Sequence, residues 1–176
     1  MVLGTRARRT QAASLPSGPP ALPRGRISLP DFPEDLRGFL SVDEFDRASH
    51  TYGQAFVDTI RRLDGNFENA PDVVAYPSTE DELSRLLGFC NDAAIVVIPF
   101  GGGTSVVCGV EPPPRACAVA CISVDMANFD RLLDVDYASH SALIQAGMTG
   151  PAIEAALKPH GLTLRFYPQV RNLRLL

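Results

Sequence analysis

The chain has 176 residues, 45% of them hydrophobic, which is enough to bury the core of one ordinary domain. Its net charge is −4, but the first thirty residues carry five arginines and no acid, so the rest of the chain carries −9. This acidic body argues against a nucleic-acid-binding protein, and no run approaches the roughly 18 apolar residues of a membrane span.

The N-terminal segment is rich in proline, glycine and serine as well as arginine. Such a segment buries too little apolar surface to offset the entropy lost on ordering, so we predict that residues 1–40 form a disordered basic tail. Arg8 and Arg9 lack the apolar stretch of roughly 7–15 residues that an export signal requires. We therefore expect a cytoplasmic protein, with an arm that touches RNA or a membrane as the alternative.

Two helices and a strand are predicted before the middle of the chain. Residues 54–64 read as a helix ended by Gly65, and residues 73–76 as a short strand. Residues 79–93 begin with capping and acidic residues and then repeat apolar residues at helical spacing. This pattern predicts a second helix with one buried face.

The most informative segment follows the predicted strand 95–99 and reads Pro-Phe-Gly-Gly-Gly-Thr-Ser from Pro99 to Ser105. Glycines allow positive φ and carry no Cβ, so several backbone N–H groups can converge on one anion. Thr104 and Ser105 add hydroxyl donors. The segment predicts a phosphate-binding loop and, with it, a nucleotide cofactor.

Three other interpretations of these glycines compete with a phosphate loop. A flexible turn between two strands remains open on the glycines alone. A Walker loop needs a Gly-Lys-Ser/Thr ending, but the single lysine of the chain is Lys158. A Rossmann fingerprint would place its third glycine at Val106 and open into a helix, which the prolines at 112–114 oppose.

Four cysteines lie in the middle of the chain without a paired Cys-x-x-Cys spacing or a nearby histidine, so we expect no metal site. We interpret all four as small buried hydrophobic residues, and two of them as neighbours on one face of a strand over 117–124. They are Cys90, Cys108, Cys117 and Cys121.

The second half of the chain alternates between strands and a helix. Alternating or β-branched apolar residues predict strands over 131–136 and 142–146, and Thr149 begins a helix that Pro159 ends. The pattern as a whole predicts an α+β domain with short helices packed on a mixed sheet.

Several ordered motifs resemble one family. The segment from Pro99 to Val110 resembles the pyrophosphate loop of the vanillyl-alcohol-oxidase type, or PCMH-type, FAD-binding domain, closest to the alkylglycerone-phosphate synthase-like FAD-linked oxidases. Segments with the same resemblance follow in the expected order: His50–Gly53, Ala70–Pro77, Ser123–Met126, Ile144–Gly147 and Gly161–Gln169.

The resemblance implies an incomplete PCMH-type domain over residues 69–176, preceded by a helical lead-in over 41–68 and lacking the cap domain. It implies FAD as the cofactor, held noncovalently because the loop contains no histidine. The implied cofactor-binding residues are Pro99, Phe100, Gly101, Gly102, Gly103, Thr104 and Ser105.

The resemblance to the family is lost after Gln169, which we interpret as truncation, with a frameshift as one origin. The implied function is the FAD-binding portion of a flavin-dependent oxidoreductase, either alkylglycerone-phosphate synthase-like or oxidising an alcohol or hydroxy acid. The alternatives are a noncatalytic half that needs a second polypeptide, or a nonfunctional remnant. We assign no catalytic residue, because His50, His140 and His160 are each expected to be structural or solvent-exposed.

Overall fold

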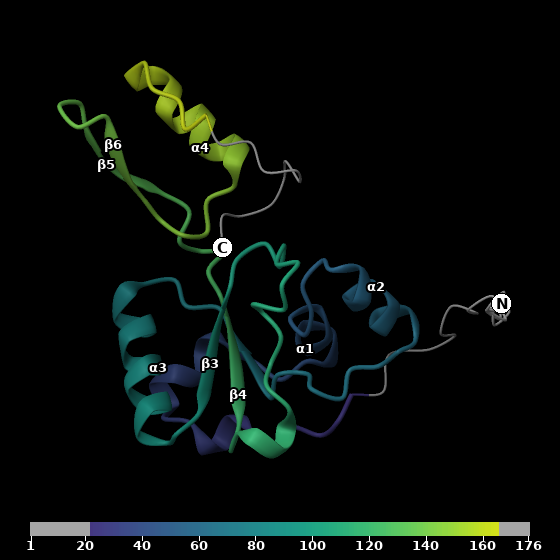
Figure 1. Cartoon of the computed structure of the whole chain (residues 1–176). Coiled ribbons are helices and arrows are strands. Elements are labelled where there is room, and N and C mark those ends of the chain that lie inside the picture. The colour runs from purple at the N-terminus through teal and green to yellow at the C-terminus, as the bar shows by residue number, and fades with distance from the viewer. Residues whose placement is uncertain (1–21, 166–176) are drawn as a thin grey trace, which may run out of the picture.

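The computed structural model describes residues 22–165, which form a helix-covered mixed sheet and, beyond one end of it, a hairpin packed against a helix (Figure 1). This architecture confirms the predicted α+β class with short helices on a mixed sheet. Most of the buried apolar side chains lie on the larger unit, and the hairpin unit has a small core of its own.

The main sheet has the strand order β1-β2-β4-β3. Its strands are β1 (Leu40–Ser41), β2 (Val73–Ala75), β3 (Val96–Phe100) and β4 (Cys121–Asp125). The strand β4 pairs in parallel with both β2 and β3, whereas β1 pairs antiparallel with β2. Three strands therefore end at the same edge of the sheet, which is where ligands bind in open parallel sheets.

Helices cover both faces of this sheet (Figure 1). The helix α3 (Glu80–Asp92) lies on one side, and α1 (Glu44–Ser49) and α2 (Phe56–Leu63) lie on the other. At the start of α3, the Thr79 hydroxyl accepts a hydrogen bond from the Glu82 amide at 3.1 Å, and the Glu82 carboxylate accepts one from the Thr79 amide at 3.2 Å. This capping box confirms the helix predicted over 79–93.

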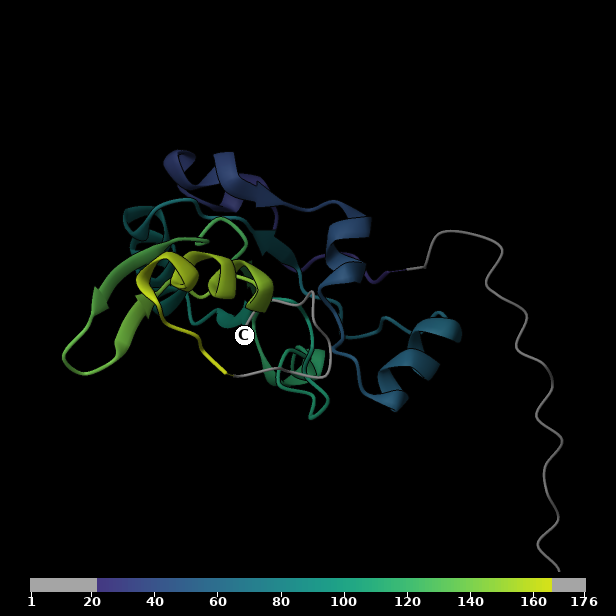
Figure 2. The same cartoon turned by 90° about the horizontal axis from the view of Figure 1, so that it is seen from above.

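The hairpin unit consists of β5 (Leu132–Asp136), β6 (Ser141–Ile144) and α4 (Gly150–Leu157). Figure 2 shows α4 lying across the hairpin, and the two share a core that contains Met148, Ile153 and Leu157. The unit is joined closely to the main sheet at Gly147, where a Cβ would lie 1.9 Å from the carbonyl oxygen of Met126. Only glycine fits at this junction.

The predicted disordered tail over residues 1–40 is wrong for residues 22–40. This segment forms the short 3-10 helices η1 (Leu29–Asp31) and η2 (Glu34–Phe39) and contributes Phe32 and Leu36 to the core. Both side chains are at most 2% exposed, and the Phe32 ring centroid lies 5.0 Å from that of Phe89 on α3. Residues 1–21, the rest of the predicted tail, lie outside the described residues.

A buried ion pair fastens this N-terminal segment to the sheet. The Arg26 guanidinium donates to both carboxylate oxygens of Asp72, at 3.1 Å from Nε to Oδ2 and 2.7 Å from Nη2 to Oδ2, with a 3.2 Å contact to Oδ1. The Cys121 amide donates to the same carboxylate at 2.8 Å. Burial alone would raise the pKa of Asp72, but the hydrogen bonds from Arg26 and Cys121 outweigh it and hold this pKa below its usual value.

The expected burial of the cysteines is correct for two of them and wrong for two. Cys90 and Cys121 are buried, whereas Cys108 and Cys117 are exposed. The predicted strand over 117–124 starts late, at Cys121, because Cys117 belongs to the 3-10 helix η3 (Arg115–Cys117) that follows the proline run. Proline removes backbone donors and opposes strand pairing there.

Candidate functional site

The glycine loop leaves the carboxyl end of β3, beside the end of β4 (Figure 1). Its conformation requires glycine at one position, because Gly103 has φ of +63° and a Cβ there would lie 2.5 Å from Cζ of Phe100. The buried Phe100 ring therefore forms a floor directly beneath Gly103. Pro99 is exposed at the end of the strand.

Backbone amides of the loop are available to a ligand. Within residues 22–165, the N–H groups of Gly102, Gly103 and Thr104 donate to no protein acceptor. The start of the loop is fixed nonetheless, because the Met126 amide donates to the Phe100 carbonyl at 2.9 Å. Several unsatisfied N–H groups in a glycine-rich bend form an anion-binding concavity.

The far end of the loop is held by the segment before α2. The Gln54 amide donates to the Ser105 carbonyl at 2.7 Å, and a Cβ on Gly53 would lie 2.1 Å from that same oxygen. The Ser105 hydroxyl oxygen accepts a hydrogen bond from the Gly109 amide at 2.8 Å. Ser105 thus shapes the turn that follows the glycines, and its hydroxyl proton remains for a ligand.

Below the loop lies a buried histidine. The His50 ring centroid is 4.3 Å from that of Phe100, and its Nε2 is 3.2 Å from Oδ2 of Asp125 at the end of β4. Its Nδ1 lies 2.8 Å from the Asp46 carbonyl oxygen. His50 is 6% exposed, so it supports the loop from inside the protein.

The other two histidines lie away from the loop. His140 is exposed in the turn between β5 and β6, and His160 is exposed at the end of the 3-10 helix η4 (Lys158–His160). The Tyr137 hydroxyl lies 2.6 Å from Nδ1 of His160. Neither histidine reaches the glycine loop in the described structure.

A tyrosine adds a neutral polar group beside His50. The Tyr76 and His50 rings meet edge to face, with centroids 5.8 Å apart. Burial, together with the carboxylates of Asp46 and Asp125, raises the pKa of Tyr76, so its hydroxyl stays protonated at neutral pH. Neither Tyr76 nor Asp125 was predicted as a site residue, although both lie within segments that carry the family resemblance.

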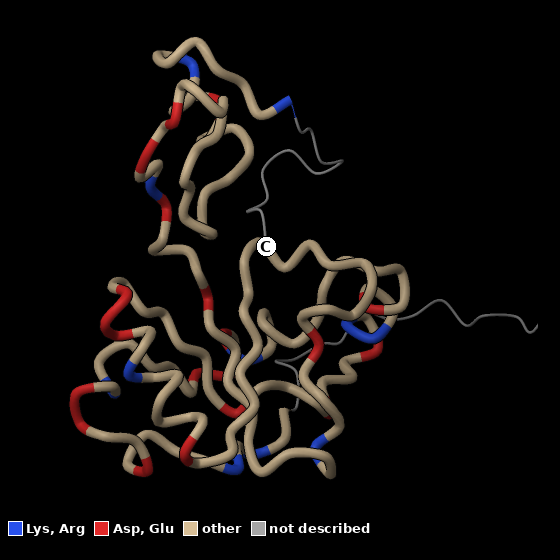
Figure 3. Tube along the Cα trace, turned by 60° about the vertical axis from the view of Figure 1, so that its left-hand side comes forward, with Lys and Arg blue, Asp and Glu red and all other residues tan. Residues whose placement is uncertain are grey.

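No charged side chain belongs to the loop itself. The stretch from Ala93 to Val110 contains no Lys, Arg, Asp or Glu. In Figure 3 the acidic and basic residues, red and blue, are scattered along the rest of the trace. The nearby cations are engaged elsewhere: Arg61 pairs with Glu111, and Arg62 donates to the carbonyls of Tyr52 and Gly53. An anion at this loop would be held by main-chain dipoles.

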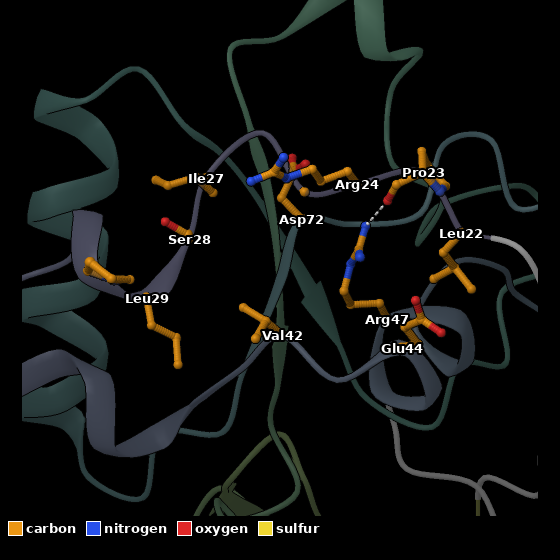
Figure 4. Close-up of a pocket in the computed structure, with 12 residues that line it drawn as sticks. Leu22, Pro23, Arg24, Ile27, Ser28, Leu29, Val42, Glu44, Arg47 and Asp72 are labelled. Atoms are coloured by element: carbon orange, nitrogen blue, oxygen red, sulfur yellow. Dashed lines mark hydrogen bonds between the residues drawn. The ribbon is translucent and has the colours of Figure 1, made fainter.

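A cavity of about 530 Å³ lies at the opposite edge of the main sheet, between residues 22–30 and α1 (Figure 4). Two of its charged side chains, Arg47 and Asp72, are bound to other parts of the protein. Arg47 donates from Nε to the Pro71 carbonyl and from Nη2 to the Pro23 carbonyl, both at 2.7 Å, and Asp72 binds Arg26. The cavity adjoins the amino end of β2, so it is separate from the glycine loop.

In the described part of the chain, none of the helices combines the length and hydrophobicity that a membrane crossing demands. This finding agrees with the short helices of the main sheet and of the hairpin unit.

Comparison with protein families gives one match over the region that contains the loop. The family described as FAD binding domain matches residues 71–173, which is more than half of the chain. The matched region extends past Gln169, where we expected the resemblance to end, and that end lies outside the described residues.

Similar proteins are much longer than this chain. Alkyldihydroxyacetonephosphate synthase of Dictyostelium discoideum is 33% identical over 144 residues, which cover 79% of this chain and 23% of that protein. The mitochondrial D-lactate dehydrogenase [cytochrome] of Arabidopsis thaliana is 27% identical over 100 residues, which cover 57% of this chain and 16% of that protein. The chain thus spans about a quarter of the length of the alkyldihydroxyacetonephosphate synthases that it matches.

A solved structure has the same fold. An alkyldihydroxyacetonephosphate synthase crystallised in P1 superposes with a TM-score of 0.77 at 31% identity, covering 88% of this chain and 32% of that one. Most of this chain therefore has the fold of one part of that longer protein.

Proposed function

The chain belongs to the family of FAD-binding domains, and from this premise we propose that Pro99 to Ser105 hold the pyrophosphate of FAD. The observation that carries the proposal is the set of loop amides, at Gly102, Gly103 and Thr104, without protein acceptors among the described residues. A bend without Cβ atoms lets both phosphates approach these donors. The Thr104 hydroxyl and the Ser105 proton complete the set.

The binding is proposed to be noncovalent. The loop from Pro99 to Ser105 contains no histidine, and the imidazole of His50 beneath it is engaged by Asp125 and the Asp46 carbonyl. Neutral N–H donors contribute roughly 0.5–1.5 kcal/mol each, so a few of them give only several kcal/mol. We therefore expect weak FAD binding by this chain alone, and a purified protein that is colourless after gel filtration.

For the longer protein, we propose a flavin-dependent oxidoreductase in which this chain is the FAD-binding portion. FAD supplies the oxidation–reduction chemistry when it is bound. The relatives named above support an alkylglycerone-phosphate synthase-like reaction or the oxidation of a hydroxy acid. We assign the lead-in to residues 41–68 and the FAD domain to residues 69–176, and we propose a cytoplasmic location.

The test is an equilibrium titration of the chain with FAD, followed by the quenching of flavin fluorescence. Gly102→Val should abolish the binding, because a β-branched side chain would fill the bend that the pyrophosphate enters. Gly88→Val is the matched control, since a Cβ at Gly88 on α3 meets nothing within 4 Å. Equal affinity of Gly102→Val and the wild type, or no binding at millimolar FAD, would contradict the assignment.

A second candidate is a noncatalytic half that pairs with a separate polypeptide carrying the remaining domain. The observation that favours it is the outer face of the hairpin, where Leu133 is 46% and Leu143 is 60% exposed. Two-stranded sheets are marginally stable alone, and a partner would cover these side chains. Co-expression with the downstream reading frames should yield a yellow complex; a pair that never co-purifies leaves the nonfunctional remnant as the alternative.

A further inference from the structure

Three potential metal ligands lie together between α2 and the turn after the glycine loop. One carboxylate oxygen of Asp58, the Sγ of Cys108 and one carboxylate oxygen of Glu111 are all within 4.8 Å of one another. Asp58 belongs to the first turn of α2, and the other two residues flank Val110, whose side chain is buried. The sequence gives no sign of this cluster, because Asp58 lies 50 positions before Cys108 and 53 positions before Glu111.

One carboxylate oxygen of Asp58 accepts no hydrogen bond in the described structure. Asp58 is fully buried, and its Oδ1 has no hydrogen-bond partner in the described structure. Its Oδ2 accepts a hydrogen bond from the Ala55 amide at 3.1 Å, which caps α2. Its nearest cation is Nη1 of Arg61 at 3.9 Å from Oδ1, which is too long for a hydrogen bond. A buried carboxylate oxygen without a hydrogen bond is costly, and coordination of an ion is one way in which native proteins satisfy such an atom.

The charges around the cluster do not balance. Nη1 of Arg61 donates to both oxygens of Glu111, at 2.9 and 3.0 Å, and lies 3.9 Å from Oδ1 of Asp58. One guanidinium thus faces two carboxylates and leaves a net charge of −1. Loss of the Cys108 proton would make the net charge −2, which one divalent cation neutralises.

We propose that Asp58, Cys108 and Glu111 form a site for a divalent transition metal of the Zn²⁺ class. One thiolate and two carboxylates, with water as the fourth ligand, suit this borderline-soft ion. Binding forms a metal–sulfur bond and releases the thiol proton to solvent. The ligand atoms must close from their present spacing to about 3.5 Å, the separation that tetrahedral bonds of 2.0–2.3 Å impose.

Such a site would tie α2 to the turn that carries Cys108 and Glu111. This turn is connected to the glycine loop through the bond from the Gly109 amide to the Ser105 hydroxyl. The metal would therefore anchor the segment after the loop to the helix next to it. The inference concerns a different set of residues from the FAD proposal and stands without it.

The experiment is a titration of the full 176-residue chain with Co²⁺, which reports thiolate coordination through a charge-transfer band in the near ultraviolet. We expect the band in the wild type and in Cys117→Ser, the matched control, because Cys117 is also exposed but lies outside the cluster. Cys108→Ser should lack the band. Competition with Zn²⁺ should remove it from the wild type.

Variants of the two carboxylates distinguish a site formed by all three residues from nonspecific metal binding by the exposed thiol of Cys108. Asp58→Asn and Glu111→Gln should each weaken Co²⁺ binding at least tenfold, since even second-shell changes around a metal cost about 10–100-fold. If Asp58→Asn impairs folding, the affinity of Glu111→Gln for Co²⁺ alone provides the test. A band that survives in Cys108→Ser, unchanged affinity in Glu111→Gln, or no band in the wild type would overturn the proposal.

Discussion

Gly53 lies against the backbone of Ser105 so closely that a Cβ on Gly53 would stand 2.1 Å from the Ser105 carbonyl oxygen. The neighbouring Gln54 amide donates to the same oxygen at 2.7 Å. The two segments are about fifty positions apart in the sequence, so this contact fixes where the glycine loop ends. The absence of one side chain before α2 thus determines the shape of the glycine loop.

Gly53→Ala should destabilise the protein by about 1–3 kcal/mol, the usual cost of forcing extra atoms into a packed site. The added methyl group must push the Ser105 backbone away and break the bond from Gln54. Urea denaturation followed by circular dichroism measures the free energy of unfolding. Gly38→Ala is the control, because a Cβ at Gly38 meets nothing within 4 Å; equal stability of the two variants would contradict the contact.

Phe32→Ala should lower the free energy of unfolding by about 3–5 kcal/mol, since it empties a position that is 1% exposed in the main core. Phe45→Ala changes the same residue type where the side chain is 79% exposed, and should alter stability by no more than about 0.5 kcal/mol. Thermal and urea unfolding of both variants check the difference. A disordered segment before residue 40 would make the two variants alike.

Asp72→Asn should cost about 3 kcal/mol at neutral pH, because it leaves the Arg26 guanidinium without its buried partner. The folded-state pKa of Asp72 lies below its unfolded value of about 3.9. Its contribution is therefore fully present above about pH 4 and disappears as the pH falls through the lower, folded-state pKa. The stability difference between wild type and variant should shrink over that acid range.

The control for this pH dependence is Asp130→Asn, which changes an exposed carboxyl outside the ion pairs of the described residues. Its unfolding free energy should follow that of the wild type across the titration. A difference between wild type and Asp72→Asn that stays constant down to pH 2 would show that the ion pair contributes nothing through its charge.

Cys108→Gly should raise the free energy of unfolding by about 1 kcal/mol when a chelator is present, because Cys108 has φ of 61°, where a Cβ is strained. Cys117→Gly lacks this benefit, since Cys117 has no positive φ, and should destabilise slightly through the added freedom of the unfolded chain. Parallel urea denaturation of both variants separates the two effects. A loss of stability in Cys108→Gly would show that the left-handed conformation costs nothing.

Local signals predicted the elements that surround the site. The capping residue Thr79 and the glycines after β3 influence only the backbone within a few residues of them. The helix over 80–92 and the strand before the loop could therefore be predicted from the sequence. The burial of Phe32 depends on a helix more than fifty positions away, which composition cannot reveal. For that reason a segment rich in proline and arginine was expected to be disordered.

The position of His50 beneath the loop could not be predicted from neighbouring residues in the sequence either. His50 follows a short helix, and nothing near it in the sequence places its ring between Phe100 and Asp125. Its position follows from the parallel pairing of β3 with β4, which brings two strand ends to one edge. The motifs that resemble the family include His50, Phe100 and Asp125, but only the tertiary structure shows that these side chains lie in contact.

The parallel pairing of β2 with β4 has a consequence for synthesis on the ribosome. Val73 and Ile122 are paired, and the buried contact of Asp72 with Cys121 spans 49 positions. A nascent chain must expose its valine-rich β2 until β4 has left the exit tunnel, because no nearer strand can complete that pairing. Contacts of such high sequence separation form slowly, so the edge of β2 that pairs with β4 stays uncovered during this interval.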